Sequence, residues 1–270
     1  MRSLGPLCAL ALAACTSAAE TDAPPVPVVV LTDEAPRVDE AAPAPATGGA
    51  PEEDGVVPKL FVRGFGAGAP GFVDGMRSFD TYKKLMIAAG FDGERHAHDL
   101  GDYDDGSDLA GMVGEIGAKL EGVMAGYPAT TKFDVLGHSL GGIIALRAVL
   151  DRKMTPRVRA FVALSSPIYG QDKQPFNCRL GFRCTDVYTT YSPFQSAPVM
   201  AYMDEHRAEL ASIVRCSVIS PQDGTIDTPM AGGQFPDGKN VVVADVSHMK
   251  LMKSEVAFAA MKEECFDGKL

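Results

Sequence analysis

Tryptophan is absent from this chain of 270 residues, which excludes a binding site built on stacked indole rings. No apolar run is long enough to cross a bilayer as a helix. Basic residues are not in excess: the formal net charge is −10, which argues against nucleic acid as a partner and against a basic membrane-binding face. Hydrophobic residues make up 46% of the chain, enough for one sizeable core or two small ones.

The first residues differ in composition from the rest. Met1-Arg2 is a short charged start, and Leu4–Ala14 is an apolar stretch too short to cross a membrane as a mature helix. This combination is typical of a secretory signal peptide, which we expect over residues 1–14. An ordinary signal peptide cleaved near Ala18-Ala19, giving a secreted soluble product, is the alternative.

Leu12-Ala13-Ala14-Cys15 resembles the lipobox of bacterial lipoproteins. That resemblance implies cleavage before Cys15, lipid attachment at Cys15 and membrane contact through this anchor. Thr16 follows, with no aspartate in the position linked to inner-membrane retention in that family. The resemblance therefore implies an exported protein of the bacterial cell envelope, on the outer membrane.

Residues 15–55 are rich in Ala, Pro, Thr and acidic side chains, as in Ala41-Ala42-Pro43-Ala44-Pro45. Such a stretch cannot bury a core, so we expect a lipidated N-terminus and an extended linker. Its apolar patch Val28–Leu31 could add an edge strand to a sheet. The folded domain is then expected over residues 56–270.

Short apolar strands alternate with helices from residue 56 onward. The pattern predicts strands at 56–62, 93–99, 133–136, 158–164, 213–219 and 241–244, and helices at 76–89, 108–124, 140–150, 199–210 and 251–264. It predicts an α/β fold, a mostly parallel sheet with helices on both faces. An insertion interrupts the alternation at about 168–198; its aromatic residues suggest a wall for an acyl pocket, or a satellite core under a long loop.

The segment Gly137-His138-Ser139-Leu140-Gly141 follows a buried strand and precedes a helix. G-x-S-x-G in this setting is typical of a nucleophile elbow, which holds a serine hydroxyl clear of the backbone. The glycines leave room for close backbone approach. We therefore expect Ser139 to be a nucleophile and the N–H of Leu140 to face a developing oxyanion.

An activated serine needs a base and an orienting carboxylate on loops at the carboxyl ends of strands. Of the five histidines, His248 alone combines a position after the last strand with the late chain order that this arrangement needs. His138 is expected to point away from the site. Asp223 directly follows the preceding strand and is the expected acid; Asp227 is the competitor, and Asp245 lies too close to His248 in the chain.

A second oxyanion donor should come from a loop after an early strand. Arg63-Gly64-Phe65 fits that place, with the N–H of Phe65 as the donor. The alternative interpretation is that this loop is an ordinary glycine turn without a role in an oxyanion hole.

From about residue 57 to 265 the chain resembles a lipase or esterase of the α/β-hydrolase superfamily, in particular the small secreted bacterial lipases. The order Ser139, Asp223, His248 is the family's order, and Ser165–Gly170 resembles the segment that follows the next strand in lipases. One departure is Arg63-Gly64, where the family usually has His-Gly. The resemblance implies a hydrolase of acyl esters that needs no metal or organic cofactor.

Four cysteines remain after Cys8 and Cys15, and an exported chain with four cysteines suggests two disulfides among three possible pairings. We expect Cys178–Cys184 within the insertion and Cys216–Cys265 between the final helix and a strand. Free buried thiols are the alternative. His96 and His98 should share one strand face, but without further ligands they do not predict a metal site.

The sequence therefore predicts a carboxylic-ester hydrolase that forms an acyl-enzyme. Two alternatives stay open. One is an acyltransferase or thioesterase with the same triad, and the other is a non-catalytic envelope lipoprotein with a hydrolase fold.

Overall fold

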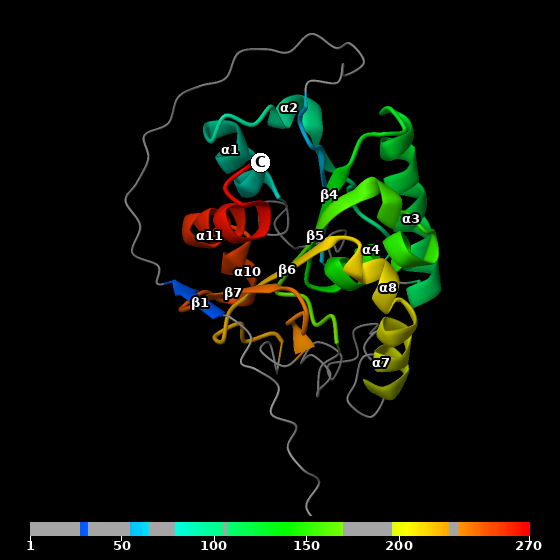
Figure 1. Cartoon of the computed structure of the whole chain (residues 1–270). Coiled ribbons are helices and arrows are strands. Elements are labelled where there is room, and N and C mark those ends of the chain that lie inside the picture. The colour runs from blue at the N-terminus through cyan, green and yellow to red at the C-terminus, as the bar shows by residue number, and fades with distance from the viewer. Residues whose placement is uncertain (1–27, 32–54, 65–78, 105–106, 170–195, 227–231) are drawn as a thin grey trace, which may run out of the picture.

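A computed structural model of the chain describes residues 28–31, 55–64, 79–104, 107–169, 196–226 and 232–270 (Figure 1). Within them, seven strands form one sheet in the order β1-β7-β6-β5-β4-β2-β3, and every pair of neighbours is parallel. The strands are β1 (Val28–Leu31), β2 (Lys59–Val62), β3 (Ala97–Asp99), β4 (Phe133–His138), β5 (Val158–Leu164), β6 (Val214–Ile219) and β7 (Lys239–Val243).

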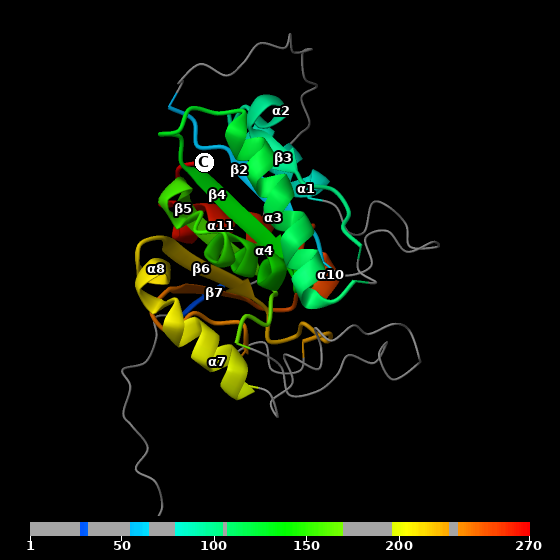
Figure 2. The same cartoon turned by 90° about the vertical axis from the view of Figure 1, so that its right-hand side faces the viewer.

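Helices cover both faces of the sheet, which confirms the predicted fold class (Figures 1 and 2). The helices α1, α10 and α11 lie on one face, and α3, α4, α7 and α8 lie on the other. Their bounds are α1 (Asp80–Ala88), α2 (Gly93–His96), α3 (Leu109–Ala125), α4 (Leu140–Asp151), α7 (Ser196–Glu205), α8 (Arg207–Ala211), α10 (His248–Leu251) and α11 (Glu255–Phe266), with a short 3-10 turn at Thr155–Arg157.

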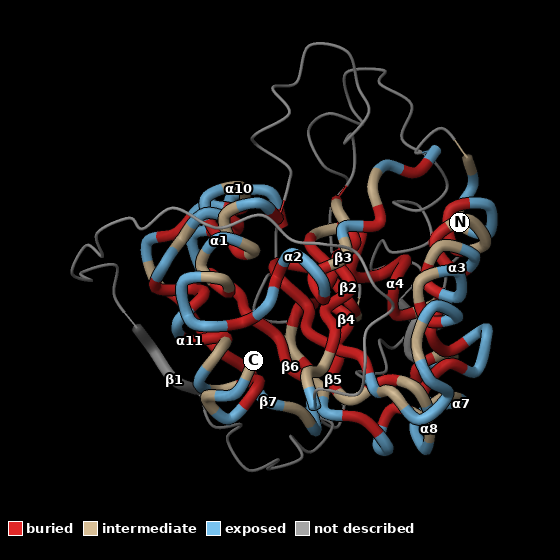
Figure 3. The backbone as a smooth tube through the Cα atoms, turned by 90° about the horizontal axis from the view of Figure 1, so that it is seen from above, coloured by how far each residue is buried: buried red, intermediate tan, exposed pale blue. Residues whose placement is uncertain are grey.

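The central strands β2, β4 and β5 are buried on both faces, as their mostly apolar sequences lead one to expect. Side chains alternate between two hydrophobic clusters: Leu60 and Val62 of β2 pack on the side of α3 and α4, whereas Phe61 packs on the side of α1 and α11. In Figure 3 the strands in the middle of the molecule are buried, and exposed positions lie on the outer helices. No helix of the described residues is both long and apolar enough to cross a membrane.

The strand predicted at Gly93–Asp99 is wrong in its first half. Residues 93–96 form α2, because the Asp92 side chain accepts the N–H of Arg95 at 3.3 Å and caps a helical turn. Only Ala97–Asp99 joins the sheet, as β3. His96 and His98 therefore do not share a strand face.

The apolar patch Val28–Leu31 does form an edge strand. It pairs in parallel with β7, from Val28 opposite Asn240 to Leu31 opposite Val243. An edge strand otherwise exposes unpaired backbone groups, so β1 protects the outer edge of β7.

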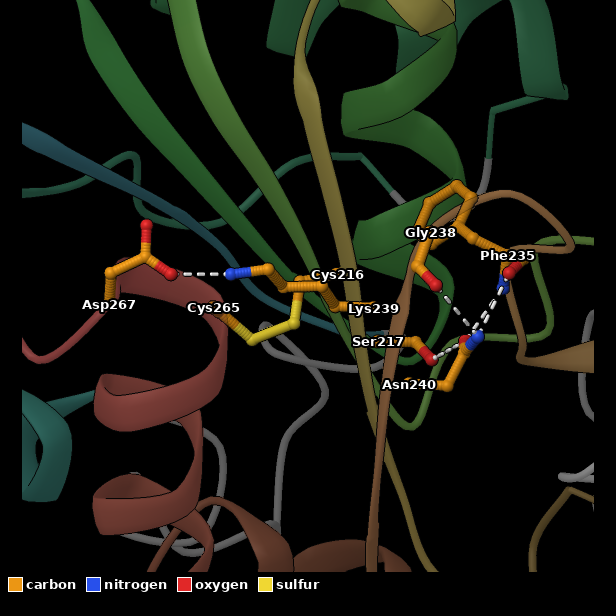
Figure 4. Close-up of a disulfide and its surroundings, with 8 residues drawn as sticks. All are labelled: Cys216, Ser217, Phe235, Gly238, Lys239, Asn240, Cys265 and Asp267. Carbon is orange, nitrogen blue, oxygen red and sulfur yellow. Dashed lines mark hydrogen bonds and ion pairs between the residues drawn. A yellow bond between two sulfur atoms is a disulfide. The ribbon is translucent and has the colours of Figure 1, made fainter. Parts of the chain in front are cut away.

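A disulfide joins Cys216 in β6 to Cys265 in α11, as predicted (Figure 4). Beside it, buried Asn240 satisfies all its polar atoms: the amide accepts from Ser217 Oγ at 2.7 Å and from Phe235 N at 2.9 Å, and donates to the carbonyl of Phe235 at 2.9 Å. These bonds fix the turn that leads into β7. Cys178 and Cys184 lie outside the described residues.

Candidate active site

Three predicted site residues follow three strands of the sheet at the carboxyl end. Ser139 follows β4, Asp223 comes four residues after β6, and His248 comes five residues after β7. The strands are parallel, so these positions belong to the same edge of the sheet, where α/β proteins place their ligands.

Ser139 sits in a strained turn between β4 and α4. Its backbone has φ 55° and ψ −130°, a conformation that residues with a side chain rarely adopt. The N–H of Ser139 donates to the carbonyl of Leu164 in β5 at 2.9 Å, which anchors the turn to the sheet. Strain of this kind on a serine between a strand and a helix is the geometry of a nucleophile elbow.

Glycines let neighbouring backbone approach this turn. A Cβ on Gly137 would collide with the backbone of Gly142, and a Cβ on Gly141 would collide with the carbonyl oxygen of Arg63. The Ser166 hydroxyl donates to the carbonyl of Gly137 at 3.2 Å from the other side. The spacing of the two glycines around Ser139 is therefore a steric requirement of the fold.

Asp223 and His248 form a buried pair. His248 Nδ1 lies 2.9 Å from Asp223 Oδ2, and the backbone N–H of His248 donates to the carbonyl of Asp223 at 2.9 Å. The other carboxylate oxygen accepts the N–H groups of Thr225 at 2.9 Å and Ile226 at 2.7 Å. Asp223 is 2% exposed and His248 is 5% exposed, so water screens this pair little.

Burial alone would raise the pKa of Asp223, but the hydrogen bonds from His248 and Ile226 hold that pKa below its ordinary value. Asp223 is therefore ionised at neutral pH and orients the imidazole so that Nε2 remains available for proton transfer. Asp245, which the sequence places too close to His248 to act as the acid, lies exposed in a turn with φ 60°, and its N–H donates to Gln222 Oε1 at 3.0 Å. Asp227 lies outside the described residues.

The sequence suggested that His138 points away from the site. In the structure, however, His138 points toward it. Its ring lies beside that of His248, with 4.6 Å between centroids, and its Nε2 is 3.2 Å from the carbonyl oxygen of His248. The contact joins residues 110 positions apart, so no local sequence signal could have predicted it.

The N–H of Leu140 lies in the first turn of α4, where backbone N–H groups lack partners within the helix. Such a donor can face an oxyanion. Phe65, the other expected donor, lies outside the described residues.

The neighbouring Arg63 side chain is tied down by two acids: its guanidinium pairs with Asp99 at 2.8 Å and Asp102 at 3.3 Å. Partial burial alone would lower the pKa of Arg63, but these acids raise it. Arg63 therefore anchors the chain after β2 to the end of β3 and to the loop that follows β3.

His96 and His98 meet at Tyr127. The Tyr127 hydroxyl is 2.6 Å from His98 Nε2 and 3.4 Å from His96 Nδ1. Among the described residues there is no group of three or more His, Cys, Asp or Glu side chains that could hold a metal ion. The pair thus belongs to a hydrogen-bonded packing contact.

The family model described as "Palmitoyl protein thioesterase" matches residues 69–215, just over half of the chain. The match includes Ser139 and ends before Asp223 and His248. No curated protein sequence matches the chain.

Several solved structures share the fold. The mature lipase BlEst2 of Bacillus licheniformis is 15% identical with a TM-score of 0.58, over 76% of this chain and 90% of that one. Lipase B of Aspergillus fumigatus is 17% identical with a TM-score of 0.58, over 80% of this chain and 53% of that one. The metagenomic carboxyl esterase MGS0156 is 14% identical with a TM-score of 0.52, over 76% and 73%. These likenesses show that the fold is that of the α/β-hydrolases.

Proposed function

We propose that this chain, which belongs to the palmitoyl protein thioesterase family, is a serine hydrolase that cleaves carboxylic acyl esters through an acyl-enzyme. The observation that carries the proposal is the buried pair of Asp223 and His248 at the same end of the sheet as Ser139. A hydroxyl, an imidazole and an ionised carboxylate in this chain order are the parts of an acyl-transfer triad.

In this mechanism Ser139 Oγ attacks the acyl carbonyl carbon, and His248 Nε2 takes the hydroxyl proton. The N–H of Leu140 stabilises the tetrahedral oxyanion. Collapse breaks the bond to the leaving alcohol, which receives the proton from His248. Water, deprotonated by His248, then attacks the acyl-enzyme, releases the carboxylic acid and returns the proton to Ser139.

The family match favours a second substrate class, acyl thioesters. The same steps serve a thioester, with a thiol as the leaving group in place of an alcohol. An acyltransferase would differ only in the acceptor, because an alcohol or amine would replace water in the second half of the reaction.

Covalent labelling tests the nucleophile. A fluorophosphonate should label the mature chain once, at Ser139, and Ser139→Ala should abolish both labelling and hydrolysis. Comparing p-nitrophenyl acyl esters with acyl thioesters of the same chain length separates the two substrate classes, and added alcohol or amine acceptors detect transfer. A chain that hydrolyses none of these substrates and stays unlabelled would be the non-catalytic alternative.

A matched pair of aspartates tests the acid. Asp223→Asn should lower kcat by about 10⁴-fold, because it removes the group that orients the imidazole and stabilises its charge. Asp245→Asn is the control, since Asp245 is exposed and its turn tolerates asparagine at positive φ. Equal activity of the two variants would remove Asp223 from the mechanism.

We also propose that the chain is exported and anchored to the bacterial envelope by lipid at Cys15. The lipobox-like Leu12–Cys15 supports this proposal. Several acyl chains on one residue hold a protein to a membrane firmly, whereas one chain binds only marginally. Cys15→Ala should shift the protein from the detergent phase to the aqueous phase; unchanged partitioning would leave the secreted soluble form.

A further inference from the structure

We propose that His138 is a positioning residue, which holds the backbone of the base His248 against the turn that carries the nucleophile Ser139. This inference rests on the proposed function, because it assigns His138 a part in the same triad. The motif G-x-S-x-G does not specify the residue before the serine, so the motif itself assigns no role to His138.

His248 is held at three points. Its backbone N–H and its Nδ1 both bond to Asp223, whereas its backbone carbonyl lies 3.2 Å from Nε2 of His138. The first two bonds fix His248 relative to the loop after β6. Of the three, the third ties it to the end of β4, where His138 is the last residue of the strand and Ser139 is the next residue in the chain.

The sheet order shows why this third bond matters. The strands β5 and β6 separate β4 from β7, so the nucleophile and the base leave the sheet three strand positions apart. Without a direct link, the distance between Ser139 and His248 would depend on two intervening loops. The hydrogen bond from His138 to the carbonyl of His248 links the two segments directly, through one contact next to Ser139 in the chain.

The chemistry fixes the protonation state of His138. A carbonyl oxygen can only accept, so the proton of His138 must be on Nε2. His138 is 2% exposed and faces the His248 imidazole, the Asp223 carboxylate and the backbone of Gly64, two residues after β2. Burial, with His248 nearby, lowers the pKa of His138 to about 3, so the ring is neutral and does not compete as a base.

Two variants of similar shape separate the hydrogen bond from packing. Glutamine and methionine have side chains of similar length, but only glutamine has an N–H donor at its end. His138→Met should lower kcat on the order of 10- to 100-fold with KM within about twofold, because the backbone of His248 is no longer bonded to the residue that precedes Ser139. His138→Gln should retain kcat within about fivefold of wild type by the same reasoning.

A measurement on the wild-type chain does not depend on whether either variant folds. With ¹⁵N-labelled histidine, the NMR spectrum should show one ring with a protonated Nε2 and a bare Nδ1 at every pH from 5 to 8. The signal is assigned to His138 by its loss in the His138→Gln variant. If that variant does not fold, slow exchange of the ring proton with solvent identifies the signal, because His138 is buried. A His138 ring with its proton on Nδ1, or one that becomes charged near pH 6.5, would overturn the inference.

The outcomes distinguish this inference from the proposed function. An active wild type with equal kcat in the glutamine and methionine variants removes the positioning role and leaves the hydrolase intact. A wild type that neither hydrolyses acyl substrates nor reacts with fluorophosphonate refutes the hydrolase, and with it the role of His138, whatever the tautomer.

Discussion

At the scale of single residues, the site depends on small side chains that let three segments meet. Gly64 follows β2 and faces the elbow: a Cβ there would lie 2.9 Å from Ser139 Cβ and 3.2 Å from the carbonyl oxygen of His138. Real Cβ atoms essentially never approach another carbon as closely as 2.9 Å. Either the turn or the loop after β2 would therefore have to move.

Gly64→Ala is accordingly expected to impair catalysis more than folding. A shift of Ser139 by a fraction of an ångström should lower kcat/KM on the order of 10- to 100-fold. Gly114→Ala is the matched control, because a Cβ on Gly114 in α3 meets nothing within 4 Å. That control should gain up to about 1 kcal/mol in the free energy of unfolding and keep its activity. Ester hydrolysis and thermal unfolding measure both, and wild-type activity in Gly64→Ala would contradict the steric argument.

The neutral buried His138 also makes stability depend on pH. Its pKa is about 3 in the folded chain, against 6.5 for an unperturbed histidine. Between these values the unfolded chain binds one more proton than the folded chain, so the free energy of unfolding decreases as pH falls. From pH 7.5 to 4.5 this residue should cost about 2 to 3 kcal/mol.

Urea unfolding at pH 7.5 and pH 4.5 measures this loss. His138→Gln carries no titrating group at this position, so its stability should fall less than that of the wild type by that amount. Parallel losses in the two proteins would mean that His138 is already protonated, or accessible to water, in the folded state.

At the scale of helices and strands, the sequence predicted the central elements well and the short ones poorly. The strands β4 and β5 are mostly apolar and almost entirely buried, and no local feature competes with that pattern. In contrast, a cap at Asp92 turned the start of a predicted strand into α2. The last helix, α11, begins at Glu255 and not at the predicted Leu251, because the Ser254 side chain accepts the N–H of Ala257 and caps the helix there.

The candidate site shows the same division. The positions of Ser139, Asp223 and His248 followed from strand order, because parallel strands bring their carboxyl ends together. The contact between His138 and His248 could not be predicted, since it depends on how the end of β4 packs against the start of α10, 110 residues later in the chain. The hydrophobic pattern of the sequence therefore does not predict short polar helix caps or contacts between residues far apart in the chain.

The disulfide between β6 and α11 permits a test at this scale. It closes a loop of sequence separation 49, and removing such a cross-link typically costs about 2 to 4 kcal/mol through the entropy of the unfolded chain. The double variant Cys216→Ala with Cys265→Ala should lose this much in urea unfolding and stay active at 25 °C. Wild-type protein treated with reductant in the unfolded state is the control, and an equal midpoint for oxidised and reduced chains would contradict the expectation.

At the scale of the whole molecule, the two ends of the sheet differ in function: one carries the candidate site, and the other holds a buried ion pair. The carboxyl ends of the strands carry the candidate site. Near their amino ends, Lys59 of β2 pairs with Asp134 of β4 at 2.9 Å, and both side chains are fully buried. Arg159 of β5 also binds Asp134, with its Nε 2.8 Å from Oδ1. Burial lowers the pKa of Lys59, although Asp134 opposes that shift.

This separation predicts that stability and catalysis can be changed independently. Asp134→Asn leaves the buried ammonium of Lys59 without its counter-charge, which should cost about 3 to 5 kcal/mol in the free energy of unfolding. The folded fraction should nevertheless keep kcat/KM within about twofold of wild type, because the strands separate this ion pair from the carboxyl ends. Urea unfolding and ester hydrolysis at low temperature measure the two quantities on the same samples.

A double replacement distinguishes an unpaired charge from lost packing. Lys59→Met with Asp134→Leu removes both buried charges while filling a similar volume, and replacing a whole buried ion pair in this way is often neutral or stabilising. Arg159 is 32% exposed and can turn to water. The double variant should therefore recover most of the free energy that Asp134→Asn loses. If it is as unstable as the single variant, packing and not charge dominates here; if either variant loses activity while folded, the two ends of the sheet are coupled.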